Sequence, residues 1–151
     1  MMNLIKRISV WGWLVVASAI FTLIGLIIYG VTSTTGYYPT TGAQWDVLPL
    51  ILSLFALVIA CALVVVKQLN KTSWITTIVL FAIVSLLIAS FVLFVLERIE
   101  MFSDVYFLPV TPPTAEVQAL NTSIAGFVFY LLSIVTIIVA AFGKSIHKQE
   151  A

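Results

Sequence analysis

Charge is scarce in this chain of 151 residues, of which only 9% are charged. Soluble domains carry about 25% charged residues. Hydrophobic residues make up 62% of the chain, and its mean hydropathy is +1.21. Side chains of this kind cannot form a water-facing surface, so the composition predicts a protein that lies in lipid. The net charge of +1 provides no basic patch, which excludes nucleic acid as an expected partner.

Cysteine and histidine each occur once, as Cys61 and His147. A lone cysteine excludes an intrachain disulfide and a cysteine-based metal site, and a lone histidine excludes a haem held by two histidines of this chain. Cys61 lies in an apolar run, where we expect a small buried hydrophobe, and His147 is expected to be a solvated tail residue. The chain also has no G-x-S-x-G, H-E-x-x-H or glycine-rich phosphate motif. We therefore expect no enzyme, no cofactor and no catalytic, cofactor-binding or metal-binding residues.

Long apolar runs, by contrast, are abundant. A membrane-spanning helix needs about 20 apolar residues, and four segments meet this length: 8–29, 48–66, 74–96 and 124–142. The sequence predicts an all-α integral membrane protein, a four-transmembrane-helix antiparallel bundle in which residues 1–151 form a single membrane domain. The outer loops are expected at 30–47 and 97–123 and the inner loop at 67–73. Because the inner loop is short, the second and third spans should be antiparallel neighbours.

The basic residues indicate how this bundle is oriented. If the spans alternate in direction, six of the seven lysines and arginines fall on the side of both termini: Lys6, Arg7, Lys67, Lys71, Lys144 and Lys148. Only Arg98 falls on the other side. Basic loops stay in the cytoplasm, so we expect a multi-pass protein of the cell membrane with both termini cytoplasmic. Aromatic rings that prefer headgroup depth lie near the predicted ends: Trp11, Trp13 and Trp74 inside, and Tyr29, Trp45 and Tyr106 outside.

Capping residues mark the predicted helix starts. Asp46 precedes the second span, Thr72–Ser73 the third and Asn121–Ser123 the fourth, and each offers an oxygen to a free backbone N–H group. Pro49 falls in the first turn of its helix, where a missing N–H group costs little.

The segment after the third span is amphipathic. At about 100° per residue, Glu97, Glu100 and Asp104 fall on one face of a continued helix, opposite Ile99, Phe102 and Tyr106. The prolines from Pro109 onward would end this helix. We expect a helical extension that projects above the membrane or bends along it, with its apolar stripe against lipid or protein. The three carboxylates are candidates for an outer acidic interaction stripe; calcium binding is the less favoured alternative to a solvated face.

Small residues recur four positions apart within the spans: Ser18 and Thr22 with Gly25 nearby, Ala56 and Ala60, and Ser85 and Ala89. Such faces allow helices to approach closely, within a chain or between chains. Together with the missing chemistry they favour a non-catalytic accessory, scaffold or regulatory subunit of a larger membrane complex, in contact with lipid and with other transmembrane proteins. The alternative is a component of an oligomeric channel or transporter for ions or small molecules. An enzyme acting on lipid or quinone is least favoured, because the carboxylates lie outside and have no histidine partner.

Four spans with two outer loops resemble claudins and tetraspanins in outline. Those families carry cysteines in their outer loops, and neither 30–47 nor 97–123 contains one. The sequence therefore indicates no family.

Overall fold

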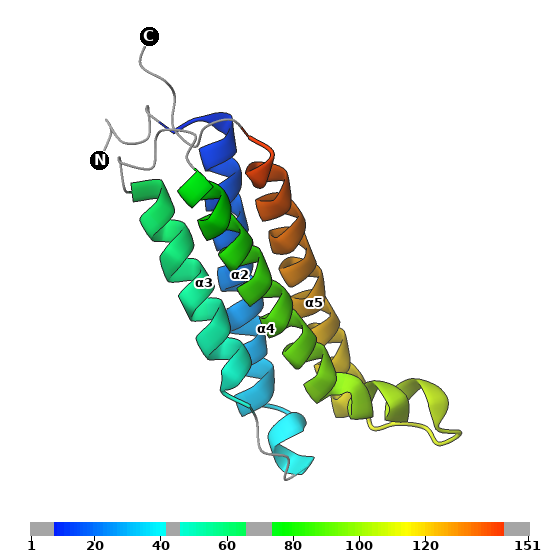
Figure 1. Ribbon diagram of the computed structural model, residues 1–151. Coiled ribbons are helices and arrows are strands. Elements are labelled where there is room, and N and C mark those ends of the chain that lie inside the picture. The colour runs from blue at the N-terminus through cyan, green and yellow to red at the C-terminus, as the bar shows by residue number, and fades with distance from the viewer. Residues whose placement is uncertain (1–7, 42–45, 66–73, 144–151) are drawn as a thin grey trace.

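A computed structural model describes residues 8–41, 46–65 and 74–143. Within these residues the chain forms four α-helices and one 3₁₀ helix: α2 (Val10–Thr34), η1 (Tyr38–Thr41), α3 (Leu48–Val65), α4 (Trp74–Phe107) and α5 (Thr114–Ala141). Each α-helix is long and apolar enough to cross a membrane. Successive α-helices run in opposite directions along one bundle (Figure 1). The predicted all-helical bundle with four spans of membrane length is confirmed.

One face of α5 is buried along the length of the helix. Its buried residues recur at intervals of three and four and include Leu120, Ser123, Gly126, Tyr130, Ser133, Ile137 and Ala140. Helices α2 and α4 pack on α5, while α3 packs more extensively on α4 than on α2. At Gly126 the approach of α4 is so close that an added Cβ would lie 2.9 Å from Phe94 Cε1. The added Cβ would also lie 2.9 Å from Ile28 Cγ2 of α2, so the absence of a side chain at this position leaves room for side chains of both α4 and α2.

The predicted outer segment at 97–123 is largely helical, which corrects the expected loop. Helix α4 continues to Phe107 and α5 already begins at Thr114. The short connection 108–113 contains the three prolines of this region. The helical extension predicted after the third span is thus present, and the connection between the last two helices is much shorter than expected.

The expected cap at Asn121–Ser123 is wrong, because these residues lie inside α5. The hydroxyl groups of Thr122 and Ser123 donate to the carbonyl oxygens four residues earlier, at 2.9 and 3.0 Å. Serine and threonine favour helix starts, but they also satisfy carbonyls within a helix in this way. The sequence pattern alone does not separate the two cases.

Other local predictions agree with the structure. Asp46 Oδ1 accepts a hydrogen bond from the backbone N–H of Leu48 at 2.9 Å, and Pro49 lies in the first turn of α3. Helices α3 and α4 pack side by side. Thr72–Ser73, the inner loop 67–73, Trp45 and His147 lie outside the described residues, as do the six basic residues that set the predicted orientation.

One predicted environment is reversed: Cys61 is exposed on the surface of the bundle rather than buried. Tyr29 is completely buried among protein partners. Its helix also continues beyond the predicted end at Tyr29 to Thr34. Polar side chains in this added part of α2, Thr32 and Ser33, contact Arg98 inside the protein.

Candidate functional site

Arg98 is the largest fully buried side chain of the described residues, with 1% of its surface exposed. It lies between α2, α4 and α5. Its Nη2 donates to Ser33 Oγ at 2.6 Å, and its Nε lies 3.4 Å from Ser123 Oγ. A guanidinium group that leaves water loses several kcal/mol unless its donors are satisfied. The hydroxyl groups of α2 and α5 therefore make the buried position of Arg98 tolerable.

Tyr38 of η1 covers one face of this guanidinium group. The Arg98 Cζ atom lies 3.8 Å from the centre of the Tyr38 ring, which is the geometry of a cation–π contact. Burial raises the pKa of Tyr38, the Glu97 carboxylate adds to the rise, and Arg98 opposes it. The stacked ring is therefore a neutral phenol. This contact fastens η1, which lies outside the four long helices, to the end of the bundle.

Glu97, the preceding residue of α4, points toward other partners. Its Oε1 accepts hydrogen bonds from the backbone N–H of Asp46 at 2.7 Å and from the Tyr29 hydroxyl at 2.8 Å. The Tyr29 hydroxyl also contacts the backbone carbonyl of Asp46. The other carboxylate oxygen of Glu97, Oε2, lies 3.4 Å from Arg98 Nη1. Glu97 thus joins α4 to α2 and to the segment just before α3.

We call these residues the polar junction: Tyr29, Thr32, Ser33, Tyr38, Asp46, Glu97, Arg98 and Ser123. Two adjacent residues of α4, Glu97 and Arg98, tie together α2, α5, η1 and the start of α3. Measured along the helix, Arg98 lies about 36 Å from Trp74 at 1.5 Å per residue. The hydrocarbon core of a bilayer is about 30 Å thick. If Trp74 lies at one interface, the polar junction lies at the other.

The predicted acidic stripe is divided in this arrangement. The Glu97 side chain is 13% exposed and is engaged in the polar junction, whereas Glu100 and Asp104 are exposed on the following turns. Among the described residues, no three or more histidine, cysteine, aspartate or glutamate side chains are grouped as metal ligands. Glu97 therefore differs from the other two carboxylates: it takes part in the polar junction, whereas Glu100 and Asp104 are exposed.

The sequence does not predict the polar junction. It indicates Arg98 as the single basic residue on the outer side and Glu97 as part of the acidic stripe. The hydroxyl partners Thr32 and Ser33 fall in a predicted loop, and Ser123 falls at a predicted helix start. A usable signal was present: a lone Glu-Arg pair at the end of one span, with hydroxyl residues at the ends of two others.

Two further groups of buried hydroxyls lie deeper in the bundle. In the first, Ser53 Oγ lies 2.6 Å from both Ser90 Oγ and the Tyr130 hydroxyl, which joins α3, α4 and α5. In the second, Ser133 Oγ of α5 lies 2.8 Å from Ser18 Oγ and 2.7 Å from Thr22 Oγ1, both of α2. These serines bond across helix interfaces.

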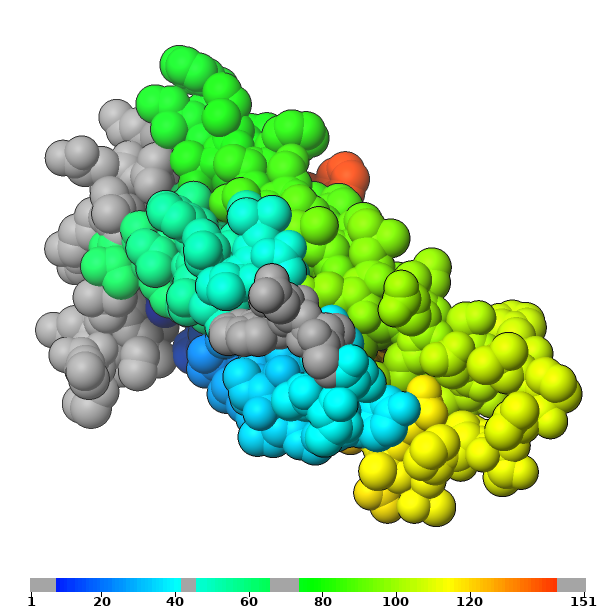
Figure 2. Space-filling model, turned by 90° about the horizontal axis from the view of Figure 1, so that it is seen from below, coloured from blue at the N-terminus to red at the C-terminus, as the bar shows by residue number. Residues whose placement is uncertain are grey.

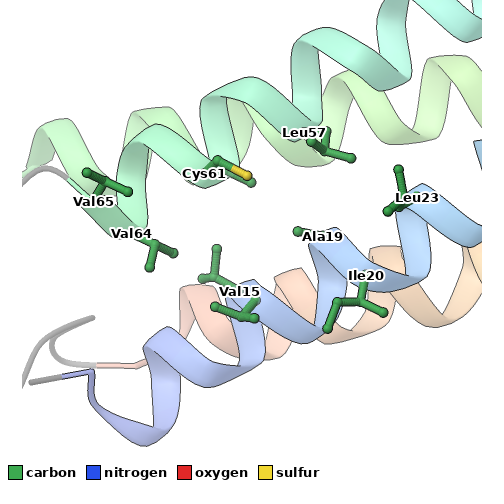
Figure 3. A pocket seen from close by; sticks show the side chains of 10 residues that line it. Val15, Ala19, Ile20, Leu23, Leu57, Cys61, Val64 and Val65 are labelled. Carbon is green, nitrogen blue, oxygen red and sulfur yellow. The ribbon is translucent and has the colours of Figure 1, made fainter. Parts of the chain in front are cut away.

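A different surface lies between α2 and α3. An open groove of about 320 Å³ runs between these helices, and its lining consists of apolar side chains and Cys61. Figure 3 shows Ala19 and Leu23 of α2 on one side of it, facing Leu57 and Cys61 of α3 on the other. Small residues, Ala19, Ala60 and Cys61, keep it open. We call this surface the α2–α3 groove.

Comparison of the chain with protein-family models, with curated proteins and with solved structures finds no match. Its function is therefore inferred from its own residues and their arrangement.

Proposed function

We propose that this protein is a non-catalytic subunit of a larger membrane complex, with an accessory, scaffold or regulatory role. The observation that carries the proposal is the α2–α3 groove, which lies between two of the membrane-length helices. Small residues such as Ala19, Ala60 and Cys61 allow the backbone of another helix to approach closely. The proposed occupant is a transmembrane helix of the partner protein.

Polar side chains within the bundle have hydrogen-bonding partners within the same chain, and this supports the proposal. Arg98 and Glu97 are engaged by partners of the same chain, and the deeper hydroxyls pair with one another. Such groups stabilise the subunit itself. The groove differs in this respect. Within the part of the chain that the structure describes, no hydrogen bond joins α2 to α3 across the groove. A partner would therefore bind there by close packing of apolar surfaces.

Some of the small-residue faces predicted from the sequence pack inside the bundle, and others lie on its surface. The Ser18–Thr22–Gly25 face packs against α5, where a Cβ added at Gly25 would lie 2.8 Å from Tyr130 Cδ2. Ala60 belongs to the core but also borders the groove. Ser85 and Ala89 are exposed on α4. The groove is the place where small residues of two helices combine into one concave apolar surface.

We further propose that both termini are cytoplasmic and that the protein spans the cell membrane. The six basic residues on the side of the termini support this orientation. The one base on the other side, Arg98, is held inside the polar junction and does not act as an exposed loop charge. Labelling of a cysteine added at either terminus of the Cys61→Ala protein tests the orientation. Labelling by an impermeant reagent in intact cells would contradict it.

Filling the α2–α3 groove tests the proposed function. The substitution Ala19→Leu adds a bulky side chain to the groove, and Ala89→Leu is a matched control on the exposed surface of α4. After extraction in mild detergent, we expect the unmodified protein and the Ala89→Leu protein to recover one partner in stoichiometric amount. The Ala19→Leu protein should recover at least tenfold less. Equal recovery with Ala19→Leu would contradict the groove as the docking surface.

The paired hydroxyls favour this proposal over an oligomeric channel. Hydroxyl groups that bond to one another across a helix interface, as Ser18 and Ser133 do, do not line an aqueous path within this chain. A channel would need several copies around a shared pore. Ion flux through liposomes that contain the purified protein would support the channel and count against the subunit.

A further inference from the structure

Helix α4 is much longer than a membrane span. Its 34 residues measure about 51 Å at 1.5 Å per residue, against a hydrocarbon core of about 30 Å. Beyond the polar junction, its last turns lead away from the bundle to one side (Figure 1). Viewed from below, the same segment again extends beyond the rest of the molecule (Figure 2). We call Ile99–Phe107 the α4 overhang.

Only one face of the α4 overhang packs on the protein. Met101, which is 6% exposed, contacts a cluster that includes Tyr38 of η1 and Leu120 of α5. This contact continues from the polar junction, which lies one turn earlier. The base of the overhang is therefore fixed to the bundle.

A second face is aromatic and exposed. Phe102 is 41% exposed and Tyr106 55%, and their ring centres lie 4.8 Å apart. Phe107 joins them, with its ring centre 6.3 Å from that of Phe102. Tyrosine is enriched at the boundary between lipid headgroups and acyl chains, and phenylalanine is typical of the apolar face of helices that lie in this boundary.

This aromatic face continues the outer surface of the span itself. Exposed apolar residues follow one another along α4 at intervals of three or four: Ile88, Val92, Leu96, Ile99, Phe102 and Tyr106. In a helix this spacing produces a single stripe. The first part of the stripe lies on the outer surface of a membrane-length helix, where a membrane would place lipid against it. The overhang presents the same stripe without interruption, which indicates the same neighbour.

The remaining face is acidic. Glu100 and Asp104 are exposed four residues apart, and Ser103 is exposed beside them. Amphipathic helices that bind anionic membranes carry lysine and arginine on this face. Carboxylates instead are repelled by anionic lipid. The polar face of the overhang thus suits water above a lipid surface without net charge.

We propose that the α4 overhang is an interfacial membrane helix, whose Ile99–Phe102–Tyr106 face binds the headgroup boundary of zwitterionic phospholipid. It lies along the bilayer surface and holds the polar junction at a fixed depth. Glu100 and Asp104 face the water. The inference does not depend on the proposed partner, because it concerns a different surface of the molecule.

Single spin labels test this arrangement. In the Cys61→Ala protein, Phe102→Cys and Ile99→Cys place a label on the aromatic face, and Asp104→Cys is the matched control on the acidic face. The purified proteins are reconstituted without any partner into phosphatidylcholine vesicles. We expect the labels at 99 and 102 to collide more with dissolved oxygen than with a water-soluble nickel chelate, and the label at 104 to show the opposite preference.

Two results would overturn the proposal. Labels at 99 and 102 that are as accessible to the nickel chelate as the label at 104 would place the overhang in water. Labels at both positions that are shielded from oxygen and nickel alike would show protein as the neighbour. Neither result bears on the α2–α3 groove, which Ala19→Leu tests separately. Using two positions on the aromatic face ensures that loss of the Phe102 ring alone does not decide the outcome.

Discussion

The polar junction and the α2–α3 groove show two opposite ways in which helices of one bundle meet. At the junction, Glu97 and Arg98 connect α4 to α2, α5 and η1 by hydrogen bonds and ring stacking. At the groove, α2 and α3 face each other with apolar side chains and leave an open space. Apolar surfaces gain little by leaving lipid, so helices in a membrane need close packing or polar contacts to associate. The polar junction therefore connects the helices of the bundle, whereas the α2–α3 groove leaves an apolar surface at which we propose that a partner helix binds.

Loss of the Arg98 side chain should have the largest effect. The substitution Arg98→Met leaves Glu97 without its charged partner. It also removes the donor to three hydroxyl groups, those of Thr32, Ser33 and Ser123. Removing one partner of a buried ion pair costs about 3–5 kcal/mol, and we expect the free energy of unfolding in detergent to fall by that order. Arg98→Lys should recover only part of it, because an ammonium group lacks the planar fork. An Arg98→Met protein as stable as the unmodified one would refute the role of the junction.

A side chain at Gly126 should have the next largest effect. A Cβ at this position meets Phe94 at 2.9 Å, whereas one at Gly30 has no atom within 4 Å. Both glycines lie inside helices, so Gly30→Val controls for the change in helix propensity. Gly126→Val should lower the free energy of unfolding by about 1–3 kcal/mol through overpacking. A loss no greater than that of Gly30→Val would show that α4 and α5 are not in close contact there.

The deeper hydroxyl groups should contribute less. Hydrogen bonds between transmembrane helices contribute about 0.6 kcal/mol on average, and Tyr130→Phe removes the contact with Ser53. A double-mutant cycle of Tyr130→Phe with Ser53→Ala measures the coupling directly. We expect a coupling of that size. Strict additivity of the two substitutions would mean that this hydrogen bond does not stabilise the bundle.

A substitution in the groove should leave stability almost unchanged. Ala19→Leu extends into open space, so the free energy of unfolding of the isolated protein should change by less than about 0.5 kcal/mol. The same substitution is expected to lower recovery of the partner at least tenfold. A large loss of stability would show that α2 and α3 pack closely at Ala19, and it would contradict the open groove at this position.

The sequence predicts the four spans well, because lipid-facing surface is apolar along whole helices and hydropathy detects it. It does not predict the ends of α2 and α5, where Thr32, Ser33 and Ser123 are polar but face Arg98 within the protein. Hydropathy cannot distinguish a polar side chain that is buried among protein partners from one in a loop. It also cannot place Cys61, since an apolar residue is equally suited to the core and to an exposed apolar groove. The junction depends on contacts between residues far apart in the chain, such as Ser33 and Arg98.

Photo-crosslinking in intact membranes tests the central claim most directly. A photoreactive amino acid at Leu57 points into the α2–α3 groove, and one at Phe81, which is 73% exposed on α4, serves as the control. We predict that the probe at 57 forms one protein adduct of defined mass and that the probe at 81 forms none. Lipid adducts alone at both positions would contradict the assignment of this protein as a subunit that receives a partner helix in its groove.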